Sequence, residues 1–126
     1  MTHALPHWQA ICRDLATRHA GNDGAHDLAH LQRVWQSASQ LLHSYPHADT
    51  LVVMAACYLH DLVNLPKNHP ERHLAWRQAA VLASTRLAAA GFDAARLPAV
   101  AHAIEAHSFS ANIAPQTLEA QIVQDA

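Results

Sequence analysis

The chain has 126 residues, of which 51% are apolar and 14% are charged, and its formal net charge is −2. This length allows one domain around a single hydrophobic core, and so small a charged fraction argues against a disordered chain. The near-neutral charge gives no electrostatic reason to expect a nucleic acid or an acidic membrane as a partner. The 12 histidines stand well above ordinary usage, so the search for a site starts with them.

The cysteines and the N-terminus bear on the cellular compartment. Cys12 and Cys57 are far apart and form no CxxC motif, so reduced thiols are expected rather than a disulfide framework. The first residues, MTHALPHW, lack the basic region and apolar run of a secretory signal. The longest apolar stretch, residues 51–59, is too short to span a bilayer. The sequence therefore predicts a cytoplasmic protein.

Alanine and leucine dominate the chain, whereas β-branched residues are sparse and show no sustained alternation with polar ones. This pattern predicts an all-α protein. The expected helices, in chain order, cover about 5–20, 25–45, 48–63, 70–90, 98–107 and 117–126. The third is apolar nearly all round and should be the central, buried helix. The segment 64–70 holds two prolines and is predicted to be a loop, as is 108–114.

The second expected helix carries two histidines in the segment AHDLAHLQRV. His26 and His30 are four residues apart, which places their side chains about 40° apart around a helix. Both could therefore face one site, with Arg33 on an adjacent row, and the spacing alone does not choose between them. An ordinary surface or core-edge position is the alternative for each.

His60 and Asp61 come at the end of the most apolar helix, in the segment YLHDL. Burying these two side chains unpaired would cost several kcal/mol, and a cation shared between them would remove that cost. A His-Asp dipeptide is common by chance, but the buried helix before it and the basic loop after it add weight here. Asp125 follows an apolar pair in IVQDA and can face inward in the same way, although taken alone it is an ordinary helical aspartate.

Four segments together resemble one known family: AHDLAHLQRVW, ACYLHDLVNLPKNHPER, HAIEAHSFSANIAP and IVQDA. Their order H…HD…D is the metal-binding signature of the HD-domain superfamily of metal-dependent phosphohydrolases. The local detail resembles the bacterial YedJ-like branch of that superfamily. The resemblance implies a single HD domain over residues 1–126, folded as an all-α bundle of about six helices.

Carried over residue by residue, the resemblance implies four metal ligands: His30, His60, Asp61 and Asp125. It selects His30 because the family's first histidine is followed by xxRV. His26 and Asp27 would then orient a ligand or a water from behind. Two imidazoles and two carboxylates suit one divalent ion, either Mn²⁺, Mg²⁺, Fe²⁺, Ni²⁺ or Zn²⁺.

The implied reaction is hydrolysis of a phosphoester or phosphoanhydride by a metal-activated water, which Asp61 helps to orient. The implied substrate is a nucleotide or a similar small phosphorylated compound. Basic side chains near the His-Asp pair are expected to meet its phosphates: Lys67, His69, Arg72 and Arg33. A solvated basic loop, and a surface salt bridge in the case of Arg33, are the alternatives.

His102 and His107 raise the question of a second metal, because some HD proteins place two further histidines before the last aspartate. Five residues along a helix separate two side chains by about 140°, so this pair cannot chelate one ion from the same face. His107 is the better candidate for the site. Two other functions stay open: an HD-fold di-iron oxygenase, which would need His107 or a similar extra ligand, and a non-catalytic module that binds a metal or a nucleotide.

Relatives of this branch continue past the last aspartate with further helices that help to close the pocket. This chain stops one residue after Asp125. Because chain ends fray, Asp125 is expected to be held loosely in such a truncated domain. Apolar surface left by the missing helices would favour self-association into a homo-oligomer.

Overall fold

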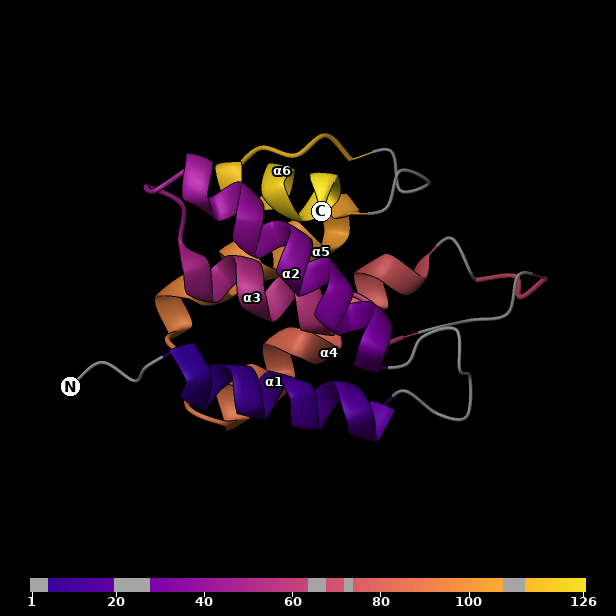
Figure 1. The fold of residues 1–126 in the computed structure, drawn as a ribbon. Coiled ribbons are helices and arrows are strands. Elements are labelled where there is room, and N and C mark those ends of the chain that lie inside the picture. The colour runs from indigo at the N-terminus through magenta and orange to yellow at the C-terminus, as the bar shows by residue number, and fades with distance from the viewer. Residues whose placement is uncertain (1–4, 20–27, 64–67, 72–73, 108–112) are drawn as a thin grey trace.

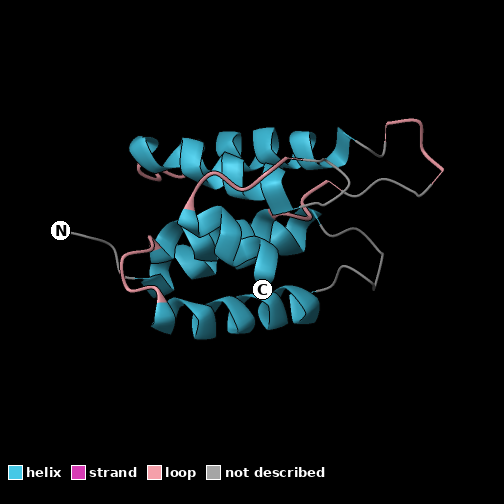
Figure 2. Ribbon diagram, turned by 90° about the horizontal axis from the view of Figure 1, so that it is seen from above, coloured by secondary structure: helices cyan, strands magenta, loops and turns pink. Residues whose placement is uncertain are grey.

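Every regular element that the computed structural model describes is helical (Figures 1 and 2). The described residues are 5–19, 28–63, 68–71, 74–107 and 113–126. The elements are α1 (Leu5–His19), α2 (Leu28–Ser44), α3 (Thr50–Leu59), α4 (Ala75–Ala89), the short 3₁₀ helix η3 (Ala94–Arg96), α5 (Leu97–His107) and α6 (Leu118–Asp125). Since these ranges contain no strand, the predicted all-α class is confirmed.

Helix α3 lies at the centre of the bundle, as its all-round apolar sequence predicts (Figure 1). It packs against α1, α2, α5 and α6, and all its residues from Val52 to Leu59 are buried. The Tyr58 hydroxyl accepts a hydrogen bond of 3.0 Å from Gln9 Nε2, which adds a polar contact between α3 and α1. Within the described ranges, none of the helices combines the length and the apolar character needed to cross a membrane.

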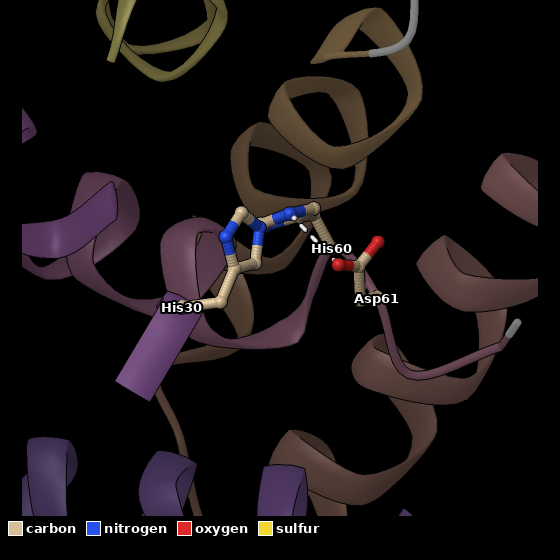
Figure 3. A group of neighbouring side chains, drawn as sticks. All are labelled: His30, His60 and Asp61. Atoms are coloured by element: carbon tan, nitrogen blue, oxygen red, sulfur yellow. Dashed lines mark ion pairs between the residues drawn. The ribbon is translucent and has the colours of Figure 1, made fainter. Parts of the chain in front are cut away.

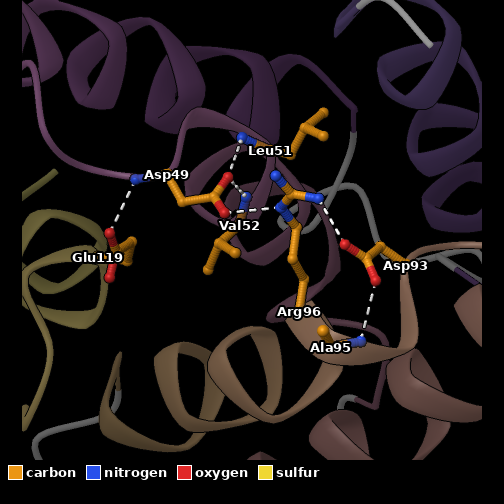
Figure 4. Close-up of polar contacts among 7 residues, drawn as sticks. All are labelled: Asp49, Leu51, Val52, Asp93, Ala95, Arg96 and Glu119. Atoms are coloured by element: carbon orange, nitrogen blue, oxygen red, sulfur yellow. Dashed lines mark hydrogen bonds and ion pairs between the residues drawn. The ribbon is translucent and has the colours of Figure 1, made fainter. Parts of the chain in front are cut away.

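The N-terminal end of α3 is set by Asp49, whose carboxylate accepts the backbone N–H groups of Leu51 at 3.1 Å and Val52 at 3.4 Å. Such a cap satisfies donors that have no partner within the helix. Asp49 also joins this end to two other elements (Figure 4). Its carboxylate accepts Arg96 Nε of η3 at 2.7 Å, and its own N–H donates to Glu119 Oε2 of α6 at 2.8 Å.

The C-terminal end of α3 corrects the predicted boundary. The expected helix continued to residue 63, whereas α3 ends at Leu59. The His60 N–H makes the last helical bond, to the Ala56 carbonyl, and the Leu62 N–H then turns back to the Leu59 carbonyl at 3.2 Å. The chain therefore turns directly after His60, and Asp61 lies in this turn rather than on a helix.

The predicted start of the fourth helix at Pro70 is also wrong. Pro70 and Glu71 lie in a turn, the Leu74 N–H bonds the Glu71 carbonyl at 2.8 Å, and α4 begins only at Ala75. The predicted end near residue 90 holds, because Gly91 follows with a φ of +90°. Glycine adopts this left-handed conformation without steric cost. The expected start of the second helix, near residue 25, falls outside the described residues.

Candidate metal centre

Three of the predicted ligands meet at the C-terminal end of α3 (Figure 3). His30 comes from the first turn of α2, His60 caps α3, and Asp61 is the next residue. Each offers one ligand atom, and these atoms all lie within 4.8 Å of one another. The contact between α2 and α3 therefore brings together residues that are thirty positions apart in the sequence.

The orientation of His60 is fixed by the backbone behind it. Its Nδ1 lies 2.8 Å from the Cys57 carbonyl oxygen. A carbonyl can only accept, so Nδ1 carries the proton and donates it, and a neutral ring then has its lone pair on Nε2. That atom faces Asp61 Oδ2 at 3.4 Å. Two acceptor atoms facing each other are favourable only with a cation between them, either a proton on the ring or a metal ion.

The three ligand atoms fit a divalent metal ion. Two ligands that each lie about 2.1 Å from one ion are at most about 4.2 Å apart, so the observed group needs only a small contraction. A histidine that donates its other N–H to a backbone carbonyl is the usual arrangement of a metal ligand. The His60 side chain is 2% exposed and that of Asp61 is 25% exposed. An ion held here would be shielded on the His60 side and open to water and substrate on the Asp61 side.

His107, the last residue of α5, lies directly against this group. The centroid of its ring is 4.1 Å from that of His60, with the two rings tilted by 54°. Burial, and to a lesser degree the nearby His60 ring, lower the pKa of His107 to about 4, so its ring is neutral at physiological pH. Its Nδ1 is buried without a hydrogen-bond partner. The Val123 backbone partly offsets this lowering of the His107 pKa. It nevertheless makes no hydrogen bond to His107 Nδ1.

Asp125 does not join the other three predicted ligands in this structure. It is the final residue of α6 and is exposed, whereas Ile122 and Val123 of the same helix are buried. Its carboxylate is not part of the group formed by His30, His60 and Asp61. The role of Asp125 as a ligand therefore stays a prediction from the family signature.

The residues predicted to contact phosphate are only partly described. Arg33 on α2 and His69 are exposed, and His69 Nδ1 accepts the Glu71 backbone N–H at 3.0 Å. With Nδ1 occupied in this way, His69 can offer a donor only from Nε2. The remaining predicted site residues lie outside the described ranges: His26, Asp27, Lys67 and Arg72.

His102 and His107 have different neighbours, as their separation on α5 predicts. The Gln116 backbone N–H donates to His102 Nε2 at 2.9 Å, so this nitrogen carries no proton and is engaged in the segment before α6. His107 faces His60 instead. His102 therefore makes a structural contact with the segment before α6 and does not belong to the group of His30, His60 and Asp61.

A family model described as HD domain matches residues 27–126. This match covers most of the chain, which therefore belongs to the HD domain family. Members of this family are generally metal-dependent hydrolases of the phosphohydrolase superfamily, and their domains bind divalent metals. The group of His30, His60 and Asp61 is compatible with that property. Comparisons with curated proteins and with solved structures give no match.

Sequence reasoning missed one contact within this centre and one beside it. The Cys57 carbonyl orients His60, and the Gln124 side chain of α6 bonds the Ala106 carbonyl at the end of α5. The first could have been inferred, because a histidine that caps a helix can reach the carbonyl three residues before it. The second depends on how α5 and α6 pack, and no pattern in the sequence indicates it.

Proposed function

We propose that this protein is a metal-dependent phosphohydrolase of the YedJ-like branch, which hydrolyses a phosphoester or phosphoanhydride of a nucleotide or a similar small phosphorylated compound. The observation that carries this proposal is the group of His30, His60 and Asp61, with His60 Nε2 turned toward the Asp61 carboxylate. Membership of the HD domain family supports the same class of reaction.

One divalent ion, Mn²⁺, Mg²⁺, Fe²⁺, Ni²⁺ or Zn²⁺, would be held by these three side chains and, following the family signature, by Asp125. When bound, such an ion lowers the pKa of a coordinated water and withdraws charge from a phosphoryl group. The protein's own contribution begins with His60, which the Cys57 carbonyl holds in the tautomer that presents Nε2. Asp61, the more exposed of the pair, holds and orients the attacking water.

Substrate would approach from the Asp61 side, where the site is open. Two exposed basic side chains of the described residues, Arg33 and His69, are proposed to contact the phosphate oxygens. Lys67 and Arg72, which flank His69 in the sequence, are proposed to act in the same way. Arginine and lysine side chains stabilise the negative charge of a phosphoryl group during its transfer.

The proposal is tested by measuring release of phosphate and pyrophosphate from a panel of nucleotides with each divalent metal. We expect turnover that EDTA abolishes. Asp61→Ala should reduce it by about 100-fold or more, since loss of groups behind a metal ligand already costs about 10–100-fold. Asp14→Ala is the matched control, because Asp14 pairs with Arg18 on the exposed face of α1. Equal hydrolysis by Asp61→Ala and wild type would show that the proposed site is wrong.

Metal analysis of the purified protein separates the two other candidate functions. One divalent ion per chain together with phosphate release supports the hydrolase. Two irons per chain would favour the di-iron oxygenase. Metal binding without turnover of any compound in the panel would favour a non-catalytic binding module.

A further inference from the structure

The last turns of α5 and α6 are joined by one side-chain hydrogen bond. Gln124 Nε2 donates to the Ala106 carbonyl oxygen at 3.0 Å, in a partly buried position. Ala106 is the second-last residue of α5, so its carbonyl is among the four at a helix end that have no partner within the helix. Gln124 thus caps α5 from a neighbouring helix.

The capped turn carries the imidazole that packs on the candidate metal centre. His107 follows Ala106, and its ring lies 4.1 Å from the His60 ring, centroid to centroid. The backbone of Val123, the residue before Gln124, tends to raise the pKa of the same His107 ring. The bond from Gln124 therefore reaches the residue directly before His107, where the last turns of α5 and α6 meet.

Gln124 is not needed simply to hold α5 and α6 together. Helices α5 and α6 already pack against each other, and apolar residues are buried on both, Ile104 and Ala103 on α5 and Ile122 and Val123 on α6. These contacts hold the helices together but do not determine how the final turn of α5 closes. A directional bond to its terminal carbonyl does, and the side chain that this turn presents to the site is His107.

We propose that Gln124 is a positioning residue of the metal centre: by capping the Ala106 carbonyl it holds the His107 ring against His60. The contact with His107, together with the Cys57 carbonyl, leaves the His60 imidazole in the orientation that presents Nε2 to Asp61. The relevance of this positioning to metal binding rests on the function proposed above. The packing of the two rings does not, and it can be measured without any metal.

The first test is NMR of the histidine side chains in the metal-free protein. Each of the two rings should shift the carbon-bound proton signals of the other away from those of an exposed histidine. Gln124→Met, which keeps the length of the side chain but has no donor, should move the signals of His60 and His107 toward exposed values. Gln124→Glu, which keeps the shape and also lacks a donor when ionised, should do the same and serves if the Met variant does not fold.

Gln121→Met is the matched control, because Gln121 lies on the exposed face of the same helix one turn earlier. It should leave both ring signals at their wild-type positions. Wild-type ring signals in both Gln124 variants, or an equal displacement in Gln121→Met, would overturn the proposal.

The second test is the affinity for Mn²⁺ by calorimetry. Gln124→Met should weaken binding by about threefold to tenfold, at or below the range for groups that support a ligand from behind. In a His107→Leu background the same change should have no further effect, because Gln124 acts through His107. An undiminished effect in that background would contradict the proposal. If the wild type itself binds no divalent metal, the proposed function fails, while the NMR result still decides the role of Gln124.

Discussion

The two ends of α3 are built from similar residue types and organised in opposite ways. At the N-terminal end the Asp49 carboxylate accepts two backbone N–H groups and the Arg96 guanidinium, so each acceptor meets a donor (Figure 4). At the C-terminal end His60 Nε2 and Asp61 Oδ2 face each other at 3.4 Å, and the His30 ring stands beside them (Figure 3). At the N-terminal end the side chains join elements through hydrogen bonds, whereas at the C-terminal end they bring three potential metal-ligand atoms within 4.8 Å of one another.

This difference separates a structural cluster from a candidate functional one. A carboxylate that the chain itself neutralises stabilises the fold and has little affinity left for a cation. At the C-terminal end the Asp61 carboxylate, the His60 imidazole and the His30 imidazole each offer a ligand atom to one position, which is the arrangement that a metal ion needs. Acidic and basic residues alone do not distinguish the two ends, but the direction of their hydrogen bonds does.

The largest expected effect concerns the buried helix that connects the two ends. Burial raises the pKa of the Cys57 thiol, and that of Cys12 on α1, to about 12. Only the thiolate reacts, so at about pH 8 the reaction with a disulfide reagent should be slower than that of an exposed thiol by about a thousandfold or more. The rate should still rise with pH at about pH 10, where an exposed thiol has levelled off. Timed reaction with a chromogenic disulfide, with and without denaturant, measures both effects.

The matching control is the fully denatured protein, in which both thiols should react at the rate of a free cysteine. Rapid labelling of either thiol in the native protein would show that α3 opens readily. The two ends of the helix could then not be treated as parts of one rigid element.

The next largest effect concerns metal binding at the C-terminal end of α3. Mn²⁺ at about a hundred times its dissociation constant should stabilise the wild type by about 2.7 kcal/mol, because it binds only the folded state. His60→Ala should abolish this stabilisation, since it removes the ligand that the Cys57 carbonyl orients. Thermal unfolding with Mn²⁺ and with EDTA gives the difference for each protein. A metal-dependent shift that persists in His60→Ala would place the ion elsewhere.

Replacing Asp49 with alanine tests the N-terminal end of α3. Asp49→Ala should lower the free energy of unfolding by about 1–2 kcal/mol, the usual cost of losing a helix N-cap. The partly exposed ion pair with Arg96 adds only a few tenths of a kcal/mol to this loss. Denaturant titration measures the change. The Mn²⁺ affinity should stay within about twofold of wild type, given that the cap lies a helix length away from His60; a larger change would mean that the two ends are coupled.

The smallest effect should come from Asp93, which bonds Arg96 at 2.6 Å and caps the short helix η3 through the Ala95 N–H. Its side chain is about half exposed. Asp93→Ala should therefore cost at most about 1 kcal/mol, because solvent screens the pair and Asp49 still holds Arg96. The same denaturant titration compares it with Asp49→Ala. A cost equal to that of Asp49→Ala would mean that Arg96 depends on both carboxylates together.

Much of the fold could be predicted because its causes are local. The apolar run 51–59 indicates a buried helix wherever it packs, and Gly91 stops α4 through its own backbone freedom. The wrong boundaries are also instructive. Nothing in the sequence from 60 to 63 forbids a helix, and Pro70 is compatible with a helix start, yet the turns closed by Leu62 and Leu74 end α3 early and begin α4 late.

By itself the sequence determined the helical class and the central place of α3, because composition and residue spacing are properties of the chain. It also gave His30, His60 and Asp61 as candidate ligands, with His30 selected over His26 by the resemblance to the HD family. Only the tertiary structure decided that these three meet, that His107 packs on His60 and that Asp125 is exposed. Helical periodicity assigns side chains to a face of their own helix. Which faces meet depends on the packing of elements far apart in the chain, and contacts such as Gln124 with Ala106 exist only once α5 and α6 lie together.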